Sequence, residues 1–274
     1  MKNKSLIITS IIFLVIIVVT LLMIMVKFIN GGSFIMFGHS VSKKKVLEKT
    51  YNIYETINID TNVADINIKE NVENNIKVVI YGDEERTNVE EKENKLNVET
   101  KMKKCKGFCF NYKIAQVNIY IPTNYKGNII ANNDTGDITV ESLENLSLDL
   151  ITNVGDVDIS SIDSAKINSK TGDINIEKIN NIIIDTNVGD IKIGLVNKHL
   201  DLKSNTGDIK IKKVNLTENS SITNNVGDIN IDSTNEIYID YKTDIGDAKV
   251  ENNYRKSDVV LKIKNNVGDI KVKN

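Results

Sequence analysis

The chain has 274 residues, a formal net charge of −2, and 26% charged residues of mixed sign. This balance argues against the strongly basic surface of a nucleic-acid-binding domain. About 235 residues follow the apolar N-terminal segment, which is enough for one large β domain.

The first predicted element is an apolar helix. Residues 6–26 carry no charge, and a helix of that length spans about 31 Å, which matches the hydrocarbon core of a bilayer. Because no small-residue cleavage site and no lipid-anchoring cysteine follow it, the pattern predicts an uncleaved signal-anchor in contact with the lipid bilayer. Lysines in the short tail 1–5 favour a cytoplasmic N-terminus, although lysines on the other flank reduce that bias. We therefore expect a single-pass protein of the cell membrane, with an extracellular C-terminal domain.

The next segments are less regular. The sequence indicates a juxtamembrane linker over 27–45 and an irregular β region over 46–130, the expected place for an atypical capping unit. Within it, residues 57–68 resemble one copy of the repeat described below, with Ala64 at the position of a glycine. Alternating apolar residues predict further strands over 76–81, 96–100 and 117–121.

Cys105 and Cys109 are the only cysteines. Together with only two histidines they do not make a zinc site. They can form a local disulfide if the domain lies outside the cytoplasm, and otherwise they are two reduced thiols on a hairpin.

The segment 131–274 is a regular repeat. Gly-Asp occurs eight times in it, at intervals of 17 to 22 residues, and a fixed period of this length is typical of stacked-repeat architectures. The glycines are Gly136, Gly155, Gly172, Gly189, Gly207, Gly227, Gly246 and Gly268.

The pattern around each glycine predicts strands and a corner. Apolar side chains lie five and seven residues before the glycine, a small polar residue lies three before, and Thr or a β-branched aliphatic residue lies one before. This period of two predicts a strand with all four positions facing inward. The phase breaks at Gly-Asp, where glycine supplies the positive φ of a tight corner.

We therefore predict an all-β fold, a parallel β-solenoid with coils of about 18 residues. The inward polar row is expected to form a hydrogen-bonded ladder. An antiparallel sandwich is the alternative, but the identical phase of every copy favours the solenoid. The chain ends on a strand that carries Lys271 and Lys273. We expect this strand to form the open edge, protected by its charges or covered through self-association.

The aspartates after the glycines have two interpretations. Each carboxylate can accept hydrogen bonds from backbone N–H groups at its corner, with lysines two residues further on for charge balance. The weaker alternative is calcium bound between coils, although carboxylates alone make a poor seven-oxygen site. That alternative concerns Asp137, Asp156, Asp173, Asp190, Asp208 and Asp228.

No catalytic residue, cofactor site or metal site is predicted. His39 and His199 have no partner in a recognisable catalytic motif, and no phosphate-binding glycine loop occurs. A carbohydrate-active β-helix enzyme remains the least favoured function, because aromatic residues amount to only 5%. The tyrosines between Cys105 and Tyr125 are the first place where we would expect a ligand.

Three features together carry a family resemblance: the N-terminal anchor, the degenerate unit at 57–68 with Ile121-Pro122 after it, and the serial Gly-Asp-Ile repeats. The chain resembles a bacterial family of β-strand-repeat proteins of unknown function that are considered candidate adhesins, including the membrane-anchored LiaG-like proteins. The resemblance covers about residues 50–274 and has no catalytic motif to transfer. It implies a cell-envelope location and a link to envelope stress. We therefore expect a non-catalytic binding or scaffold protein of the cell envelope, with an envelope protein or glycan as partner. A cytoplasm-facing, self-associating scaffold is the alternative.

Overall fold

The computed structural model describes residues 33–35, 40–102, 107–109 and 113–273, which fall into two compact units. The smaller unit contains β1 (Ser33–Ile35) and β8 (Gly107–Cys109), which pair in parallel. The predicted membrane segment 6–26 lies outside the described residues. Within the described part of the chain, we find no helix with the length and apolarity needed to cross a membrane.

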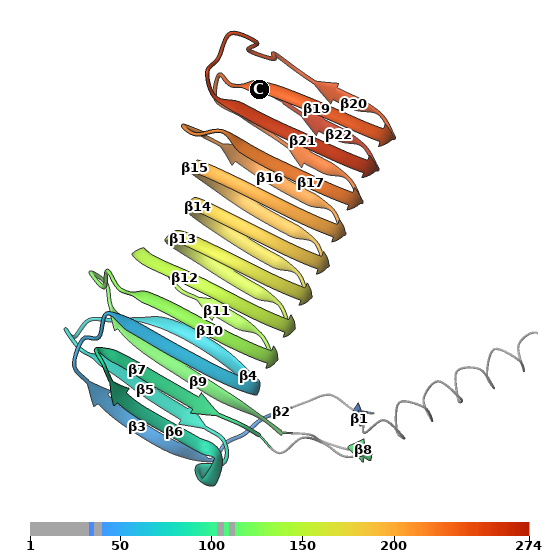
Figure 1. Ribbon diagram of the computed structural model, residues 1–274. Helices are drawn as coiled ribbons and strands as arrows, with labels where there is room; N and C mark the ends of the chain where they lie inside the picture. Colours follow the sequence, from blue (N-terminus) through green and yellow to red (C-terminus); the bar gives the residue numbers. More distant parts are fainter. Residues whose placement is uncertain (1–32, 36–39, 103–106, 110–112, 274) are drawn as a thin grey trace, which may run out of the picture. The chain divides into compact units, whose positions relative to one another are not determined.

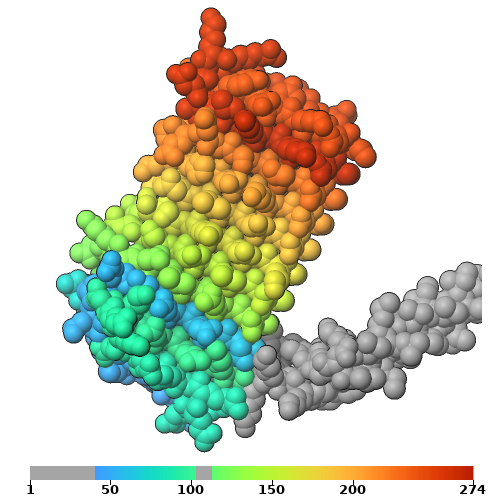
Figure 2. All heavy atoms as spheres, in the orientation of Figure 1, coloured from blue at the N-terminus to red at the C-terminus, as the bar shows by residue number. Residues whose placement is uncertain are grey.

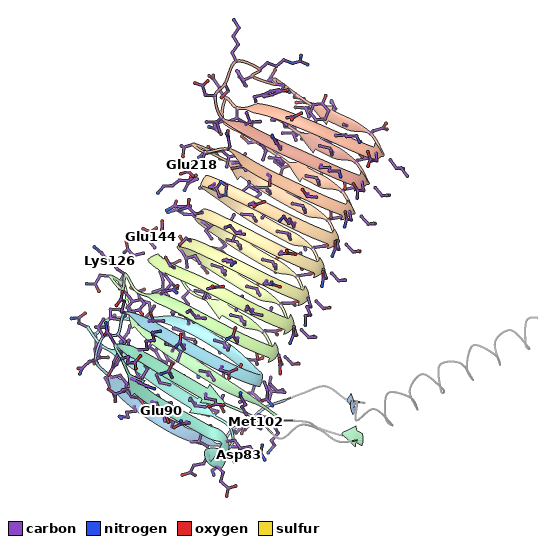
Figure 3. The ribbon with its side chains drawn as sticks, in the orientation of Figure 1. Asp83, Glu90, Met102, Lys126, Glu144 and Glu218 are labelled. Carbon is purple, nitrogen blue, oxygen red and sulfur yellow. The ribbon has the colours of Figure 1, made fainter. Side chains whose placement is uncertain are left out.

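The larger unit is a stack of parallel β coils (Figure 1), so the predicted β-solenoid is confirmed. Each coil crosses one layer, turns at its glycine and returns through a second layer. Figure 3 places Glu144 and Glu218 on the side of the stack away from the glycine corners. The stacked strands are β10 (Asn128–Thr135), β11 (Ile138–Val140), β12 (Leu143–Val154), β13 (Val157–Thr171), β14 (Ile174–Val188), β15 (Ile191–Thr206), β16 (Ile209–Val214), β17 (Ser220–Val226), β18 (Ile229–Ile231), β19 (Tyr238–Ile245), β20 (Ala248–Val250), β21 (Val260–Val267) and β22 (Ile270–Val272).

The core lies between the two layers. In β14, Ile174 and Ile176 come from the second layer and Ile182 and Ile184 from the first, and all four are at most 3% exposed. Equivalent residues of neighbouring strands stand in register, so each aliphatic position forms a continuous row. Each buried side chain of this size contributes about 1.5–3 kcal/mol, and the stacked rows therefore hold the coils together.

The corners need glycine for two reasons, which Gly172 illustrates. Its φ is +142°, a backbone conformation that side chains with a Cβ avoid. In addition, a Cβ on Gly172 would lie 2.0 Å from the carbonyl oxygen of Gly155 in the adjacent coil. The other seven repeat glycines also have positive φ, between 127° and 145°.

The row immediately before the glycines was expected inside and is outside. Val154, Val188 and Val226 are 50%, 48% and 47% exposed, and the threonines of the intervening coils are exposed as well. The reason is that the chain begins to turn one residue earlier than the alternation suggests. The residue two before each glycine already drops out of the strand-pairing register.

The inward polar row is buried, but the expected hydrogen-bonded ladder forms only in part. The Asn224 amide donates to the carbonyl oxygens of Gly207 (3.1 Å) and Gly227 (3.2 Å). Four hydroxyls in consecutive coils have no hydrogen-bond partner among the described residues. These four are Thr152, Ser169, Thr186 and Ser204.

At the N-terminal end, β4 (Thr56–Asn71) pairs in parallel with β10 and β11 on one side and with β7 (Lys95–Thr100) and β9 (Lys113–Pro122) on the other. The chain between β4 and β10 therefore adds one further coil at this end before it returns to the stack. β4 pairs with β10 before Ala64 and with β11 after it, so it also turns between the two layers there, although Ala64 does not have the positive φ of the glycine corners. The other strands of this end include antiparallel pairs. They are β2 (Ser40–Val41), β3 (Lys45–Tyr51), β5 (Ile76–Tyr81) and β6 (Thr87–Lys92), with the 3-10 turn η1 (Glu84–Arg86) before β6.

At the C-terminal end, the coils do not stack in sequence order. β21 pairs with β17 on one side and β19 on the other, and β22 lies between β18 and β20 in the same way. Figures 1 and 2 show the red C-terminal residues between earlier coils. The expectation that the strand with Lys271 forms the open edge is therefore wrong.

The terminal coil is instead formed by β19 and β20. Its inward row contains Tyr241, which is 42% exposed, and the neighbouring corner residue Ile245 is 66% exposed. The side-chain amide of Asn253 exchanges two 2.8 Å hydrogen bonds with the backbone of Ile239. The loop after β20 thus covers the start of the edge strand, while the rest of the strand stays open.

Candidate functional site

The aspartates of the repeat form a continuous ladder along one edge of the stack. In each coil the backbone N–H of the aspartate donates to Oδ1 of the aspartate in the adjacent coil. The Asp173 N–H, for example, lies 2.8 Å from Oδ1 of Asp156, and the Asp190 N–H lies 2.9 Å from Oδ1 of Asp173. The ladder follows the spatial order of the coils, since Asp247 donates to Asp269 and Asp269 to Asp228.

This geometry agrees with the hydrogen-bonding interpretation of the aspartates. One oxygen of each acceptor carboxylate already binds a backbone donor. The described residues contain no group of three or more His, Cys, Asp or Glu side chains arranged to hold a metal ion. Calcium between the coils remains an untested alternative.

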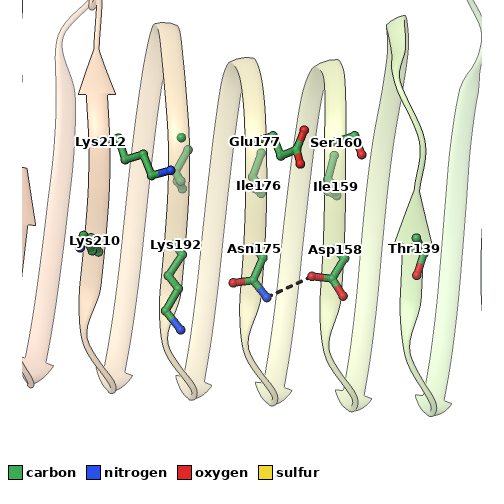
Figure 4. Close-up of a pocket in the computed structure, with 12 residues that line it drawn as sticks. Thr139, Asp158, Ile159, Ser160, Asn175, Ile176, Glu177, Lys192, Lys210 and Lys212 are labelled. Atoms are coloured by element: carbon green, nitrogen blue, oxygen red, sulfur yellow. Dashed lines mark hydrogen bonds between the residues drawn. The ribbon is translucent and has the colours of Figure 1, made fainter.

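A shallow hollow on the second layer has a different character. It has a volume of about 640 Å³ and extends over β11, β13, β14, β15 and β16 (Figure 4). We call it the side groove. Its lining combines three lysines, two carboxylates, polar residues and the backbone of three buried isoleucines. The residues are Thr139, Asp158, Ile159, Ser160, Asn175, Ile176, Glu177, Lys192, Ile193, Gly194, Lys210 and Lys212.

Strand register explains why these side chains meet. The second layer has two outward rows, three and five residues after each glycine. In the first row, Asp158, Asn175, Lys192 and Lys210 are successive neighbours. In the second, Gly194 stands between Glu177 on one side and Lys212 on the other.

Gly194 opens the centre of the side groove. It has no side chain to fill the space between Glu177 and Lys212. A Cβ at this position would lie 2.3 Å from the carbonyl oxygen of Glu177. Close backbone approach therefore keeps glycine here, and Lys212 extends from β16 toward β15 across the opening in Figure 4.

The two ends of the side groove carry opposite charge. At the β13–β14 end, Asn175 donates to Asp158 over 3.0 Å, and Glu177 lies beside them. At the β15–β16 end, Lys192 forms a long ion pair of 3.9 Å with Asp190. Lys210 and Lys212 form no ion pair with a residue that the structure describes. Their ammonium groups are therefore available to an anionic ligand.

A second hollow of about 580 Å³ lies at the N-terminal end, where the tyrosines had suggested a ligand. Its base is closed by Tyr125, which is only 4% exposed and donates to the carbonyl of Glu55. Burial raises the pKa of Tyr125 well above its usual value. Gly127 packs against the ring. This tyrosine is therefore a packing residue, and the hollow offers less cationic charge than the side groove.

The sequence profile of the family described as Toastrack DUF4097, a domain of unknown function, matches residues 54–274. The chain belongs to this family. No curated protein matches it.

Solved structures are similar to this chain at low sequence identity. A candidate adhesin from Bacteroides fragilis NCTC 9343 is 19% identical with a TM-score of 0.50, over 86% of this chain and 100% of that one. A candidate lipid-binding protein from Parabacteroides distasonis ATCC 8503 is 15% identical with a TM-score of 0.47, over 86% and 100%. A candidate cell adhesion protein from Clostridium sporogenes ATCC 15579 is 17% identical with a TM-score of 0.26, over 84% and 99%. At this identity, the likeness to the Bacteroides protein supports the fold alone.

The remaining residues singled out from the sequence lie apart from the side groove. Cys105 and His39 fall outside the described residues, and Cys109 is described only as part of β8, so the disulfide stays a prediction. His199 is half-buried, and its Nδ1 lies 2.9 Å from the carbonyl oxygen of Asn219. The side groove of this Toastrack protein was not expected. Its signal in the sequence is Gly194, where other coils carry a polar side chain, next to a coil with lysines in both outward rows.

Proposed function

We propose that this Toastrack protein is a non-catalytic, adhesin-like binding or scaffold protein of the bacterial cell envelope. In this proposal residues 6–26 anchor it in the cell membrane in the LiaG-like manner. The large β unit projects to the outside and presents its flat layers to an envelope protein or glycan.

One observation carries the binding role. The interior of the stack is filled by aliphatic rows that are almost fully buried, whereas polar and charged side chains stand in register on its outside. Among the described residues, the polar and charged groups that can contact a partner therefore lie on the outer faces of the stack. A rigid surface with repeated side chains suits an extended partner better than a small substrate that must be enclosed.

The anchor is supported by sequence. The 21 residues 6–26 are uncharged and match a bilayer in length, as about 20 apolar residues are needed for one crossing. The lysines of the N-terminal tail favour an inside N-terminus and hence an outside β unit.

A self-associating scaffold is the second candidate, because the terminal coil has a specific open feature. β19 carries exposed Tyr241 and Ile245 and is paired on one side only for most of its length. Exposed strand edges are places where another chain can pair. Copies paired edge to edge at this end would form dimers of the chain rather than bind a glycan.

Thiol labelling in intact cells tests the compartment. Both native cysteines are replaced by serine, and Lys203→Cys places one thiol on an exposed outer position of β15. We expect a membrane-impermeant maleimide to label it without lysis. The matched control is Lys4→Cys in the predicted cytoplasmic tail, which should label only after lysis. Labelling of Lys203→Cys only after lysis would overturn the external location.

A further inference from the structure

We infer that the side groove binds a phosphate-bearing polyhydroxy polymer, with phosphate at the lysine end and hydroxyl groups at the carboxylate end. The inference deepens the proposed envelope-binding function and rests on it for the biological source of the polymer. It concerns a site on β11–β16 that can be tested separately from the membrane location.

The lysine end has the geometry of an anion site. Lys192 and Lys210 are register neighbours on adjacent strands, about 4.8 Å apart at the backbone. Lys212 is two residues further along β16, about 7 Å from Lys210. Three ammonium donors at these spacings can bind one phosphate from several sides. Lysine serves as a point charge for phosphate, without the fixed planar geometry that arginine imposes.

The carboxylate end selects against a simple polyanion. Asp158 and Glu177 would repel a second anionic group, yet they and the hydroxyls of Thr139 and Ser160 accept or exchange hydrogen bonds with sugar or polyol hydroxyls. The oriented Asn175–Asp158 hydrogen bond holds one carboxylate in place. A ligand that alternates phosphate with hydroxyl groups matches both ends, whereas a polycarboxylate matches only one.

The dimensions fit a segment of a linear polymer. The side groove crosses five successive strands, which corresponds to about 19 Å along the stack at 4.8 Å per strand. Its centre at Gly194 has no side chain in the way. A single phosphate ion would fill only the lysine end, so the full length is explained better by an extended ligand.

The test measures binding of the full-length chain in detergent micelles to immobilised poly(glycerol phosphate). The variant Lys192→Gln/Lys210→Gln/Lys212→Gln removes the three groove lysines. The control Lys166→Gln/Lys170→Gln/Lys203→Gln removes three exposed lysines from the other layer of the same coils, with the same change in net charge. Since one exposed charge contact changes affinity by up to about fivefold, we expect the groove variant to lose on the order of tenfold or more. The control should stay close to wild type, and raised salt should weaken wild-type binding.

A gain variant guards against misfolding of the triple variant. Asn175→Lys adds a fourth lysine to the side groove, in the row of Lys192 and Lys210, and we expect it to bind poly(glycerol phosphate) several-fold more tightly. Polyglutamate and uncharged dextran are the competing probes. Equal binding of polyglutamate would overturn the assignment to phosphate, and equal losses in the two triple variants would overturn the site. Absence of any wild-type binding would overturn the proposal. Binding of whole envelope material that is unchanged in the groove variant would reject this site while leaving the binding role intact.

Discussion

At the scale of single residues, the corner glycines determine how closely the coils stack. Each combines a positive φ with the carbonyl oxygen of the corner residue in an adjacent coil at a distance that leaves no room for a Cβ. The aspartate that follows then reaches the backbone of the next coil through its side chain. Glycine thus permits adjacent coils to approach closely, and the aspartate side chain forms a hydrogen bond between them.

Replacement of a corner glycine should be costly. Gly172→Ala puts a Cβ 2.0 Å from the Gly155 oxygen and forces an alanine into an unfavourable φ. The backbone conformation alone costs on the order of 1–3 kcal/mol, and the overlap adds to it. Urea unfolding followed by circular dichroism should show this loss. Thr171→Ala at the exposed adjacent position should change the unfolding free energy by no more than about 0.5 kcal/mol. An unchanged stability of Gly172→Ala would contradict the corner geometry.

The buried hydroxyls predict an opposite response. Thr186 Oγ1 has no partner among the described residues, so Thr186→Val removes an unpaired polar atom while keeping the shape of the side chain. We expect unfolding free energy to stay equal or to rise. Asn224→Leu is the contrasting variant, because its amide donates to two glycine carbonyls, and its loss should cost about 1–3 kcal/mol. A clear destabilisation by Thr186→Val would mean that the hydroxyl is hydrogen-bonded in solution.

At the scale of elements, the order of the last coils differs from the order of the sequence. The inward residues Leu261, Ile263 and Asn265 of β21 continue the buried rows. β19 carries Tyr241 in an equivalent inward position, and Ala248 follows its corner instead of a larger aliphatic residue. The better-matched coil lies inside the stack, and the less regular coil is exposed at its end.

Engineered disulfides can establish this order. With the native cysteines replaced by serine, Val226→Cys/Val267→Cys joins register neighbours, whose Cα atoms lie about 4.8 Å apart, within the range of a disulfide. Val226→Cys/Ile245→Cys spans two coils, about 10 Å, which is too far. Oxidation should therefore shift the non-reducing gel mobility of the first variant only. Efficient bridging of the second pair would indicate stacking in sequence order.

Periodicity predicted the parallel stack and its corners because those features repeat in every copy. It failed where a position departs from the average. The Val188 row points outward because the turn begins early, and β4 turns at Ala64 without the positive φ of the glycine corners. The C-terminal order was missed although Ala248 and the long 22-residue interval before Gly268 mark an atypical coil. The side groove is lined by side chains from several coils that are neighbours in space. The pattern within one repeat copy therefore does not predict it.

At the scale of the whole molecule, the large unit has two candidate interaction surfaces. The second layer offers the side groove, with Lys210 and Lys212 unpaired among the described residues. The terminal coil offers an open edge with exposed Tyr241 and Ile245. A binding protein would use the first, and a self-associating scaffold would use the second.

Site-specific photo-crosslinking in intact cells distinguishes these roles most directly. A photoreactive residue is placed in the full chain at Lys210 in the side groove, at Lys203 on the other layer, or at Tyr241 on the terminal coil. The proposed function predicts a high-mass envelope adduct from position 210 and little from positions 203 and 241. Dimers of the chain formed from position 241, with no adduct from position 210, would contradict it.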